Sequence, residues 1–237
     1  MMKSPDSHFF QKPLIVGENT LNEEESLHAL RVCRAKDGDI LRLCDGEGHF
    51  ASGVITKADA RGCQVLVEEI EKSTLQKPYL SIALAHLKDD GNEEVVFHAS
   101  QMLVDEIIFL RTDHSQEPKN SDCKKTLRRA ELKSKVGLKQ SMKPWLTNIK
   151  GPISLDDWLL AYTGNLVLAD INGSPSMPPL SVNSKTTLLI GPEGGFSTRE
   201  IELIKGYSKG HVYLLSLGPT RLRARTAAIV ALGKCLQ

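Results

Sequence analysis

The sequence predicts an α/β protein in which a small β-rich domain precedes a larger domain with a mostly parallel sheet. Three observations support this prediction. Short apolar segments separated by glycine turns fill the first third of the 237-residue chain. From Tyr79 onward, apolar segments alternate with helical ones, as in proteins with parallel sheets. Residues 189–200 then run from an apolar strand through a glycine-rich turn into a helix, the position where open α/β sheets bind ligands.

The first domain is expected over residues 1–72. Asn22 and Glu25 have the spacing of an N-terminal cap for a short helix. Strands are expected over residues 40–43, 50–56 and 63–70, with short turns between them as in a small barrel. Residues 72–78 are polar and end in proline, so we interpret them as a linker.

The second domain is expected over residues 73–237. Its predicted strands cover residues 80–85, 107–110, 166–169, 187–190 and 212–217. Its predicted helices cover residues 93–103, 124–141, 155–162 and 226–236. A further helix begins at Ser197, which has capping-box spacing with Glu200. Residues 172–179 are rich in proline and small residues and are expected to form a loop.

Composition narrows the class of protein. Apolar residues make up 41% of the chain and charged residues 25%, as in soluble globular proteins. No apolar run is long enough to span a membrane, and residues 1–10 lack the apolar core of a signal peptide, so we expect a cytoplasmic protein. The five cysteines form no CxxC pair, so we expect reduced, mostly buried thiols and no metal site.

Charge is unevenly distributed along the chain, although the formal net charge is only +1. Residues 119–150 are strongly basic, and a second basic cluster consists of Arg221, Arg223 and Arg225. A basic surface on a near-neutral protein is compatible with a nucleic-acid partner, whereas a single basic run is more often a solvated helix surface. The two clusters together favour nucleic acid.

The glycine-rich turn indicates a ligand site built from backbone. Gly191, Gly194, Gly195 and Gly218 have no Cβ, so the main chain can approach a ligand closely. A nucleoside-triphosphate loop is excluded because no lysine follows the glycines as that motif requires. A dinucleotide site of the GxGxxG type is disfavoured because that motif is absent.

The segment GPEGGF at residues 191–196, taken with LSLGPTRLR at residues 215–223, resembles the SPOUT superfamily of methyltransferases. More narrowly, the chain resembles the ribosomal RNA small subunit methyltransferase E family, which methylates N3 of a uridine in 16S ribosomal RNA. Residues 28–34, together with Asp45 and Gly46, are similar to that family's PUA-like β-barrel RNA-binding domain. The resemblance therefore spans nearly the whole chain.

The resemblance implies a trefoil knot in the C-terminal domain, S-adenosylmethionine as the cofactor, a homodimer, and the small ribosomal subunit or its 16S RNA as the partner. The cofactor-binding residues that it implies lie mostly in the glycine segments and are Leu168, Gly191, Pro192, Glu193, Gly194, Gly195, Leu215, Leu217, Gly218 and Leu222. Adenine needs an apolar slot for its faces, which Leu215, Leu217 and Leu222 would furnish.

We expect an arginine side chain to contribute to catalysis of the expected reaction. Methyl transfer from a sulfonium is an in-line displacement, so positioning provides much of the acceleration. A cation near the uridine carbonyl oxygens would stabilise charge that builds there in the transition state. Arg223 is the candidate, with Arg225 as a second donor; the alternative for Arg223 is a salt bridge to a neighbouring carboxylate. Glu193 is expected to hold the turn by accepting from backbone N–H groups.

RNA contacts are expected from residues in both parts of the chain. His28, Arg31 and Arg34 lie at helical spacings i, i+3 and i+6 and would share one helix face. Arg221 is the fourth candidate. Contacts of these side chains with phosphates would give affinity without sequence information, and plain solvent exposure remains the alternative.

The chain departs from the family pattern on the expected substrate side. Residues 224–227 read Ala-Arg-Thr-Ala where the family usually has Thr-Glu-Thr-Ala, so an acidic position has become basic at Arg225. The helix near residues 93–104 also lacks the family's lysine. Two further functions therefore stay open. One is an RNA-binding or ribosome-assembly factor with weak or no turnover, and the other is a SPOUT methyltransferase acting on another RNA site.

Overall fold

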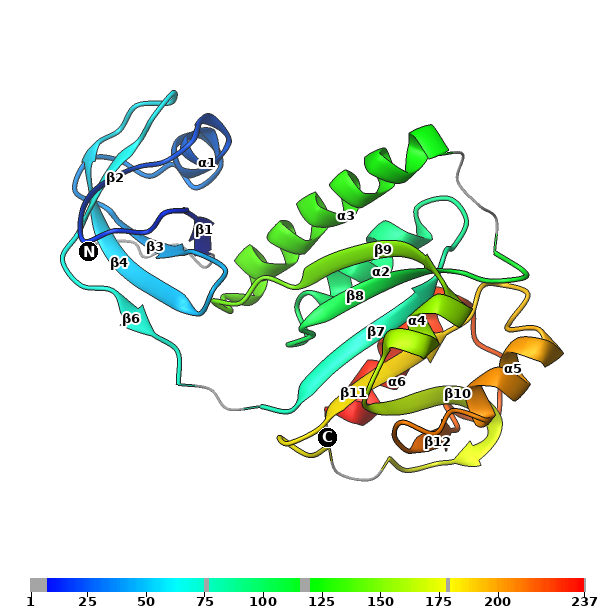
Figure 1. The fold of residues 1–237 in the computed structure, drawn as a ribbon. Coiled ribbons are helices and arrows are strands. Elements are labelled where there is room, and N and C mark those ends of the chain that lie inside the picture. The colour runs from blue at the N-terminus through cyan, green and yellow to red at the C-terminus, as the bar shows by residue number, and fades with distance from the viewer. Residues whose placement is uncertain (1–7, 75–76, 116–119, 178–179, 237) are drawn as a thin grey trace. The chain divides into compact units, whose positions relative to one another are not determined.

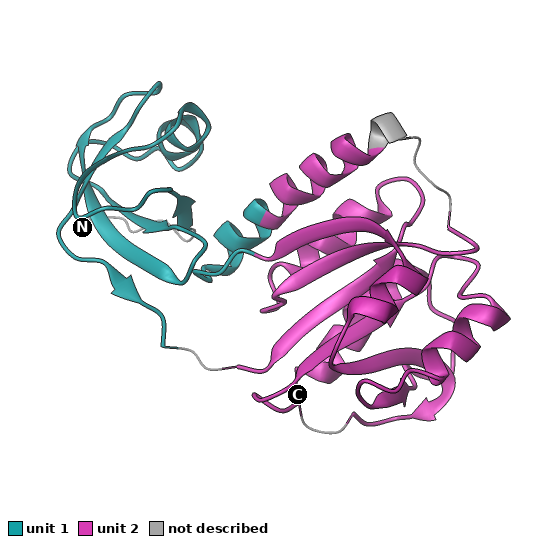
Figure 2. Ribbon diagram, viewed as in Figure 1, with its two compact units in different colours: residues 1–75, 135–146 teal, residues 76–134, 147–237 magenta. Residues whose placement is uncertain are grey.

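The computed structural model describes residues 8–74, 77–115, 120–177 and 180–236. Parts of three segments used for prediction lie outside the described residues: the N-terminal segment 1–10, the linker 72–78 and the loop 172–179. The chain divides into two compact units, residues 1–75 with 135–146 and residues 76–134 with 147–237 (Figure 2). Each unit has a hydrophobic core of its own.

The first unit is built on a mostly antiparallel sheet. Its strands are β1 (His8–Phe10), β2 (Gly17–Thr20), β3 (Ile40–Cys44), β4 (His49–Lys57), β5 (Gln64–Val67) and β6 (Glu71–Lys72). They lie in the order β1-β3-β4-β5-β2, with β6 paired to β4 (Figure 1). Leu41, Leu43, Val65 and Val67 alternate with exposed residues along their strands and are buried in the core. The strands predicted at residues 40–43, 50–56 and 63–70 are therefore present, although β5 ends at Val67 and not at residue 70.

The short helix of the first unit begins as predicted but ends early. In α1 (Glu23–Leu27), the Asn22 side chain accepts a hydrogen bond from the Glu25 N–H at 2.9 Å, which confirms the cap. The chain continues as one π-helical segment, His28–Val32. Arg34 follows this segment with a φ of 55°. The expectation that His28, Arg31 and Arg34 share one helix face is therefore wrong, because the helix ends before Arg34.

The C-terminal part of helix α3 (Asn120–Ser141) and the residues after it belong to the first unit. Lys139 Nζ lies 2.7 Å from Glu25 Oε1, and both side chains are largely buried. The Lys135 ammonium lies 4.8 Å from the centre of the Phe10 ring. Leu146 N donates to Gly46 O at 2.9 Å, which joins the segment to the turn after β3.

The second unit contains a parallel sheet, as predicted. Its strands are β7 (Tyr79–Ala85), β8 (Glu106–Arg111), β9 (Asn148–Ser154), β10 (Asn165–Ser174), β11 (Lys185–Ile190) and β12 (Val212–Leu215). They lie in the order β12-β10-β11-β7-β8-β9, and every neighbouring pair is parallel.

Helices cover both faces of the parallel sheet. The remaining helices are α2 (Gly91–Ala99), α4 (Leu155–Ala161), α5 (Thr198–Lys205) and α6 (Ala224–Cys235). Helices α2, α3 and α6 pack on one face, and α4 and α5 pack on the other (Figure 1). This explains why β7 is a nearly continuous apolar run and why β11 is buried from Thr186 to Ile190, since a strand covered on both faces has no solvent side. Within the described residues, no helix is long and apolar enough to span a bilayer.

The structure corrects several predicted boundaries. Strand β10 extends to Ser174, so residues 172–174 are strand and not loop; a bulge between Ala169 and Ser174 brings Ser174 opposite Leu215 of β12. Helix α2 ends at Ala99 and not near residue 103. Strands β1, β2, β6 and β9 were not predicted. Strand β2 reads Gly-Glu-Asn-Thr and has no apolar residue, and β9 contains Gly151-Pro152, a pair typical of turns.

The start of α5 is fixed by a buried carboxylate. Ser197 and Glu200 form the predicted capping box, which is confirmed. Glu200 is fully buried, and its carboxylate accepts from Ser197 N at 2.8 Å and from Asp113 N at 2.8 Å. One side chain thus joins the glycine turn before α5 to the loop after β8.

We predict that Glu200→Ala lowers the free energy of unfolding by about 2–4 kcal/mol, because two part-buried N–H groups lose their buried acceptor and the helix loses its capping box, each costing about 1–2 kcal/mol. Urea unfolding followed by circular dichroism measures this change. The control is Glu202→Ala on the exposed side of the same helix, which should change stability by less than about 0.5 kcal/mol. Equal effects of the two substitutions would contradict the role given to Glu200.

A second buried polar pair lies directly after β7. Asn92 Oδ1 accepts from Leu87 N at 3.0 Å, so its Nδ2 is the atom that donates to His86 Nδ1 at 2.8 Å. Burial lowers the pKa of His86 below its ordinary value. The folded protein therefore favours the neutral imidazole, and the unfolded chain binds a proton more readily.

We predict that the free energy of unfolding falls as the pH drops below about 6.5, because the unfolded chain then takes up a proton that folded His86 resists. His86→Gln removes this contribution, so its stability should fall less than that of the wild type between about pH 7.5 and pH 5.5. His8, whose pKa burial also lowers, is present in both proteins and cancels in the comparison. Parallel losses of stability in the two proteins would refute the assignment to His86.

Candidate active site

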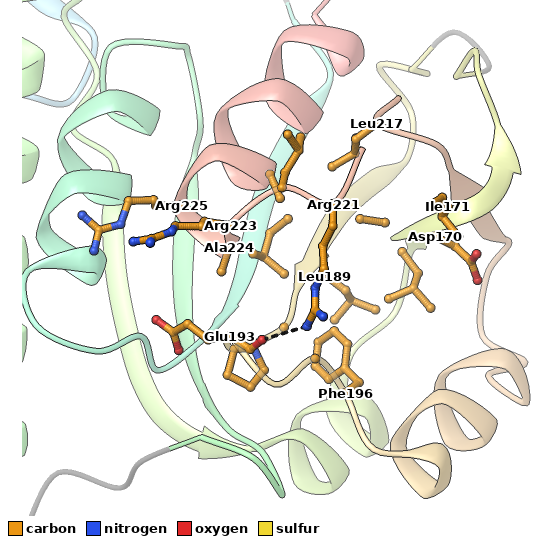
Figure 3. Close-up of a pocket in the computed structure, with 18 of the residues that line it drawn as sticks. Asp170, Ile171, Leu189, Glu193, Phe196, Leu217, Arg221, Arg223, Ala224 and Arg225 are labelled. Atoms are coloured by element: carbon orange, nitrogen blue, oxygen red, sulfur yellow. Dashed lines mark hydrogen bonds between the residues drawn. The ribbon is translucent and has the colours of Figure 1, made fainter. Parts of the chain in front are cut away.

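A pocket lies at the carboxyl ends of the central strands in the second unit (Figure 3). Its volume is about 870 Å³. Four segments contribute to its walls, namely the loop after β7, the end of β10, the glycine turn after β11 and the segment that leads into α6. This is the edge of a parallel sheet at which ligands bind, so the predicted place for a ligand site coincides with a pocket.

Glycines shape the wall formed by the turn. A Cβ on Gly191 would lie 3.2 Å from the Phe196 ring, closer than most real contacts. Gly195 has a φ of +73° and Gly218 a φ of +126°, backbone conformations that side chains other than glycine rarely adopt. Gly195 N donates to Pro192 O at 2.8 Å and closes the turn. The backbone path around the pocket therefore requires glycine at these positions.

The floor and one side of the pocket are apolar. The apolar side chains that line it are Leu168, Ile171, Leu189, Ile190, Phe196, Ile201, Leu217 and Leu222. Ile171 is 63% exposed although it lies in β10, which is buried from Leu166 to Leu168, so the pocket is open to solvent on that side. A flat ring could be held between such side chains while its polar edge meets the backbone.

Glu193 ties the glycine turn to neighbouring segments. Its carboxylate accepts from the backbone N–H of Lys88 at 3.3 Å, which fits the structural role expected for it. Its carbonyl oxygen accepts from Arg221 Nη2 at 3.4 Å, the contact drawn in Figure 3. This hydrogen bond holds the Arg221 side chain against the turn. Lys88 and the next residue, Asp89, also line the pocket.

The two catalytic candidates are in different environments. Arg223 is exposed, occupies the N-cap position of α6 and lines the pocket. Within the described part of the chain it has no carboxylate within salt-bridge distance, so the alternative of a salt bridge is not observed. Arg225 lies one residue further along; its Nη1 is 2.6 Å from Glu94 Oε2 and 3.4 Å from Asp90 Oδ1.

Two cofactor candidates lie behind the pocket wall. Leu215 is 1% exposed and packs in the core of the sheet. Gly194 lies against His114, whose Nδ1 is 3.0 Å from the carbonyl oxygen of Gly195. Neither residue lines the pocket, whereas the other eight candidates do.

Sequence reasoning missed the acidic side of the pocket. Asp170 lines it opposite Arg223 and Arg225 (Figure 3), and its Oδ1 accepts from Asn172 N at 2.9 Å. Asp170 comes directly after the predicted strand 166–169, and a polar residue at the carboxyl edge of a parallel sheet was the available signal. Lys88 and Asp89 follow β7 in the same way and were also missed.

The RNA-contact candidates of the first unit differ in accessibility. The His28 ring packs on Phe9 with centroids 5.3 Å apart, whereas Arg31 and Arg34 are exposed. Much of the basic segment 119–150 is engaged within the protein. Its engaged residues are Arg129 with Glu93, Lys135 with Phe10, Lys139 with Glu25, and Lys150 with Glu106. The expected basic surface is therefore smaller than the sequence indicates.

The arrangement combines an apolar slot, a backbone cradle and an unpaired arginine at its rim. Such a site can bind a ligand with an aromatic ring and polar groups, and the arginine can stabilise negative charge on a second molecule. No cluster of three or more metal-ligating side chains is found among the residues that the structure describes. None of the five cysteines, which all lie within the described residues, forms a disulfide, and Cys44, Cys63 and Cys235 are buried.

Comparison with known proteins gives matches along nearly the whole chain. A family model of the RNA methyltransferase domain matches residues 75–236, and one of the RNA methyltransferase PUA domain matches residues 21–68. A ribosomal RNA small subunit methyltransferase E from Rickettsia conorii is 28% identical over 221 residues, which cover 90% of this chain and 87% of that protein. The protein of the same name from Mesomycoplasma hyopneumoniae is 29% identical over 215 residues, covering 90% of this chain and 91% of that protein.

The fold is also found among solved structures. The crystal structure of a ribosomal RNA small subunit methyltransferase E from Neisseria gonorrhoeae, bound to S-adenosyl methionine, superposes with a TM-score of 0.82. It is 18% identical and covers 96% of this chain and 95% of that chain, so this likeness concerns the fold. The family model spans the pocket and more than half of the sequence. The chain therefore belongs to the RNA methyltransferase family and carries its PUA domain at the N-terminal end.

Proposed function

We propose that this protein transfers a methyl group from S-adenosylmethionine to N3 of a uridine in 16S ribosomal RNA of the small subunit. The observation that carries this proposal is the glycine-framed pocket with Arg223 unpaired at its rim. The curated relatives from Rickettsia conorii and Mesomycoplasma hyopneumoniae are named small-subunit ribosomal RNA methyltransferases, which supports the RNA class of the substrate.

The residues of the pocket fit S-adenosylmethionine. Cβ atoms are missing where the backbone is left-handed or crowded, at Gly191, Gly195 and Gly218, and leucines line the adjoining slot. We assign the cofactor to the pocket residues Leu168, Gly191, Pro192, Glu193, Gly195, Leu217, Gly218 and Leu222, with Gly194 and Leu215 supporting them from behind. When bound, the cofactor supplies a methyl group made electrophilic by its positive sulfonium. The protein's task is then to hold donor and acceptor in line.

Arg223 supplies the charge that the reaction needs. A uridine N3 becomes nucleophilic as it loses its proton to solvent water and negative charge builds on the flanking carbonyl oxygens. A guanidinium at the pocket rim stabilises that charge, and it does so more in the transition state than before it. Arginine stays protonated and cannot act as the base. Arg225 is paired with Glu94, so we assign the direct contact to Arg223 alone.

Binding of the RNA involves both units. Arg31 and Arg34 are exposed on the PUA unit and are suited to phosphate contacts, with His28 packed behind them. Arg221 lies at the pocket and would meet the RNA close to the reacting base. We include a homodimer in the proposal, since the resemblance to the family implies one.

The decisive experiment incubates the purified protein with labelled S-adenosylmethionine and small ribosomal subunits that lack the modification. Incorporation of one methyl group, mapped to N3 of a single uridine, is the expected result. Cofactor binding without transfer would instead favour an RNA-binding assembly factor. Transfer to a ribose or to another base would favour a methyltransferase of different specificity.

We predict that Arg223→Ala lowers kcat for methyl transfer by about 100-fold, because the charge on the uridine oxygens loses its stabilising partner. The affinity for S-adenosylmethionine, measured by calorimetry, should change little, and Arg223→Lys should recover part of kcat. Lys205→Ala, at the exposed end of α5, serves as the control for loss of a surface cation. A normal kcat together with impaired cofactor binding would show that Arg223 contributes to binding of the cofactor and not to catalysis.

We predict that Gly218→Ala weakens S-adenosylmethionine binding by about 10-fold or more, because a side chain strains the left-handed backbone at a φ of +126° by about 1–3 kcal/mol. Gly233→Ala is the matched control, since this glycine lies inside α6 with nothing within 4 Å of the added Cβ. It should leave binding unchanged and stabilise the fold by about 0.5–1 kcal/mol. Unaltered affinity in Gly218→Ala would exclude this glycine from the cofactor cradle.

A further inference from the structure

The N-terminus of helix α6 carries no compensating negative charge of its own. Arg223 is the N-cap residue and makes no capping hydrogen bond with its side chain, and the first turn contains no acidic residue. The free N–H groups at a helix N-terminus carry partial positive charge, so an arginine in that turn is unfavourable. Arg225 occupies this position.

Helix α2 supplies the missing negative charge. Glu94, in the first turn of α2, places Oε2 2.6 Å from Arg225 Nη1, and Asp90 places Oδ1 at 3.4 Å. Asp90 is the N-cap residue of α2, yet its side chain makes no capping hydrogen bond. Its carboxylate lies close to Arg225 instead of capping its own helix. Two carboxylates of one helix thus hold one arginine of another.

The two helices are packed together at this point. Ala224 and Ala228 of α6 share a buried core with Val95 and Val96 of α2. Alanine side chains are small, so the backbones of the two helices can lie close together. A shift of the first turn of α6 would therefore also move the residues directly before and after that turn. Arg223 is the residue that directly precedes this turn.

Stability alone does not account for the ion pair. The side chain of Arg225 is 31% exposed, that of Glu94 41% and that of Asp90 76%. Exposed pairs of this kind contribute only about 0–1 kcal/mol. Their location at the pocket is the more specific feature, because Arg225 itself lines the pocket beside Arg223 (Figure 3).

We infer that Glu94 and Asp90 are positioning residues that act through Arg225: they hold the first turn of α6 against α2 and so fix the place of the Arg223 guanidinium at the pocket rim. They also neutralise Arg225, so that it does not compete with Arg223 for the electron-rich atoms of the substrate. The effect of Glu94 and Asp90 on methyl transfer rests on the proposed function, whereas their effect on the position of α6 does not.

The test reverses the charges singly and together. Arg225→Glu and Glu94→Arg each place like charges side by side and should lower the single-turnover rate of methyl transfer by about 10-fold or more, since small displacements of a catalytic group are costly. The double variant Arg225→Glu/Glu94→Arg restores the pair and should recover the rate to within about 3-fold of the wild type. The affinity for S-adenosylmethionine should stay within about 3-fold throughout.

Hydrogen exchange separates the inference from the proposed function. Amides of residues 227–230 should exchange about 10-fold faster in each single variant and return to the wild-type rate in the double variant. This measurement does not require methyl transfer. It therefore tests whether the ion pair fixes the first turn of α6 even when the wild type transfers no methyl group. Unchanged exchange in the single variants, or a double variant as impaired as the singles, would overturn the inference.

The control reverses an ion pair of equal length outside the pocket. Lys150 Nζ lies 2.6 Å from Glu106 Oε1, between β9 and β8. Glu106→Lys, which reverses the carboxylate of this pair, should leave the transfer rate and the exchange of residues 227–230 unchanged. A loss as large as that of Arg225→Glu would mean that charge reversal in general, and not the pair at α6, impairs the protein.

Discussion

The buried carboxylate of Glu200 is the contact on which the pocket depends most. It accepts from the backbone of both Ser197 and Asp113, and so holds the end of the glycine turn and the loop after β8 in one place. Arg199, the residue before it, extends the arrangement by bridging Asp113 and Asp156 at 3.0 and 2.7 Å. A pocket made from backbone needs such support, because glycine adds conformational freedom that must be removed elsewhere. The side chains of Glu200 and Arg199, which fix this part of the pocket wall, therefore do not line the pocket themselves.

The distribution of charge around the pocket follows from the parallel arrangement of the strands in the second unit. Parallel strands end at one edge of the sheet, and the helices that follow them begin there with their positive N-terminal ends. Helices α2 and α6 both begin beside the pocket, and the carboxylates of Asp90 and Glu94 lie between α2 and Arg225. Charges of both signs therefore lie on this side of the pocket, where Glu193 is near Arg223, and Asp170 lies across the pocket (Figure 3).

The sequence predicted the architecture better than the details of the site. Apolar segments and the capping box at Ser197 identified most strands of both units and the start of α5. The glycine motifs identified the pocket, since glycine at positive φ leaves a direct mark in the sequence. Strand β2 has no apolar residue, and the two isoleucines of β9 flank a Gly-Pro pair typical of turns, so neither strand shows the apolar pattern from which strands are predicted. Asp170 was missed because a lone carboxylate after a strand gains meaning only when the opposite wall is known. The trefoil knot and the homodimer stay predictions.

The basic residue at position 225 shows why a departure from a family pattern must be judged with its neighbours. Taken alone, an arginine in place of an acidic residue at the expected substrate side indicates a weakened site. In the folded protein its charge is met by Glu94 at 2.6 Å, in the helix near residues 93–104 that lacks the family's lysine. In this chain the basic residue on α6 faces a carboxylate of α2, so the two helices attract each other at this point. The charge of Arg225 is therefore balanced from outside its own helix. Of the two arginines that line the pocket here, Arg223 is the one with no carboxylate at salt-bridge distance among the described residues.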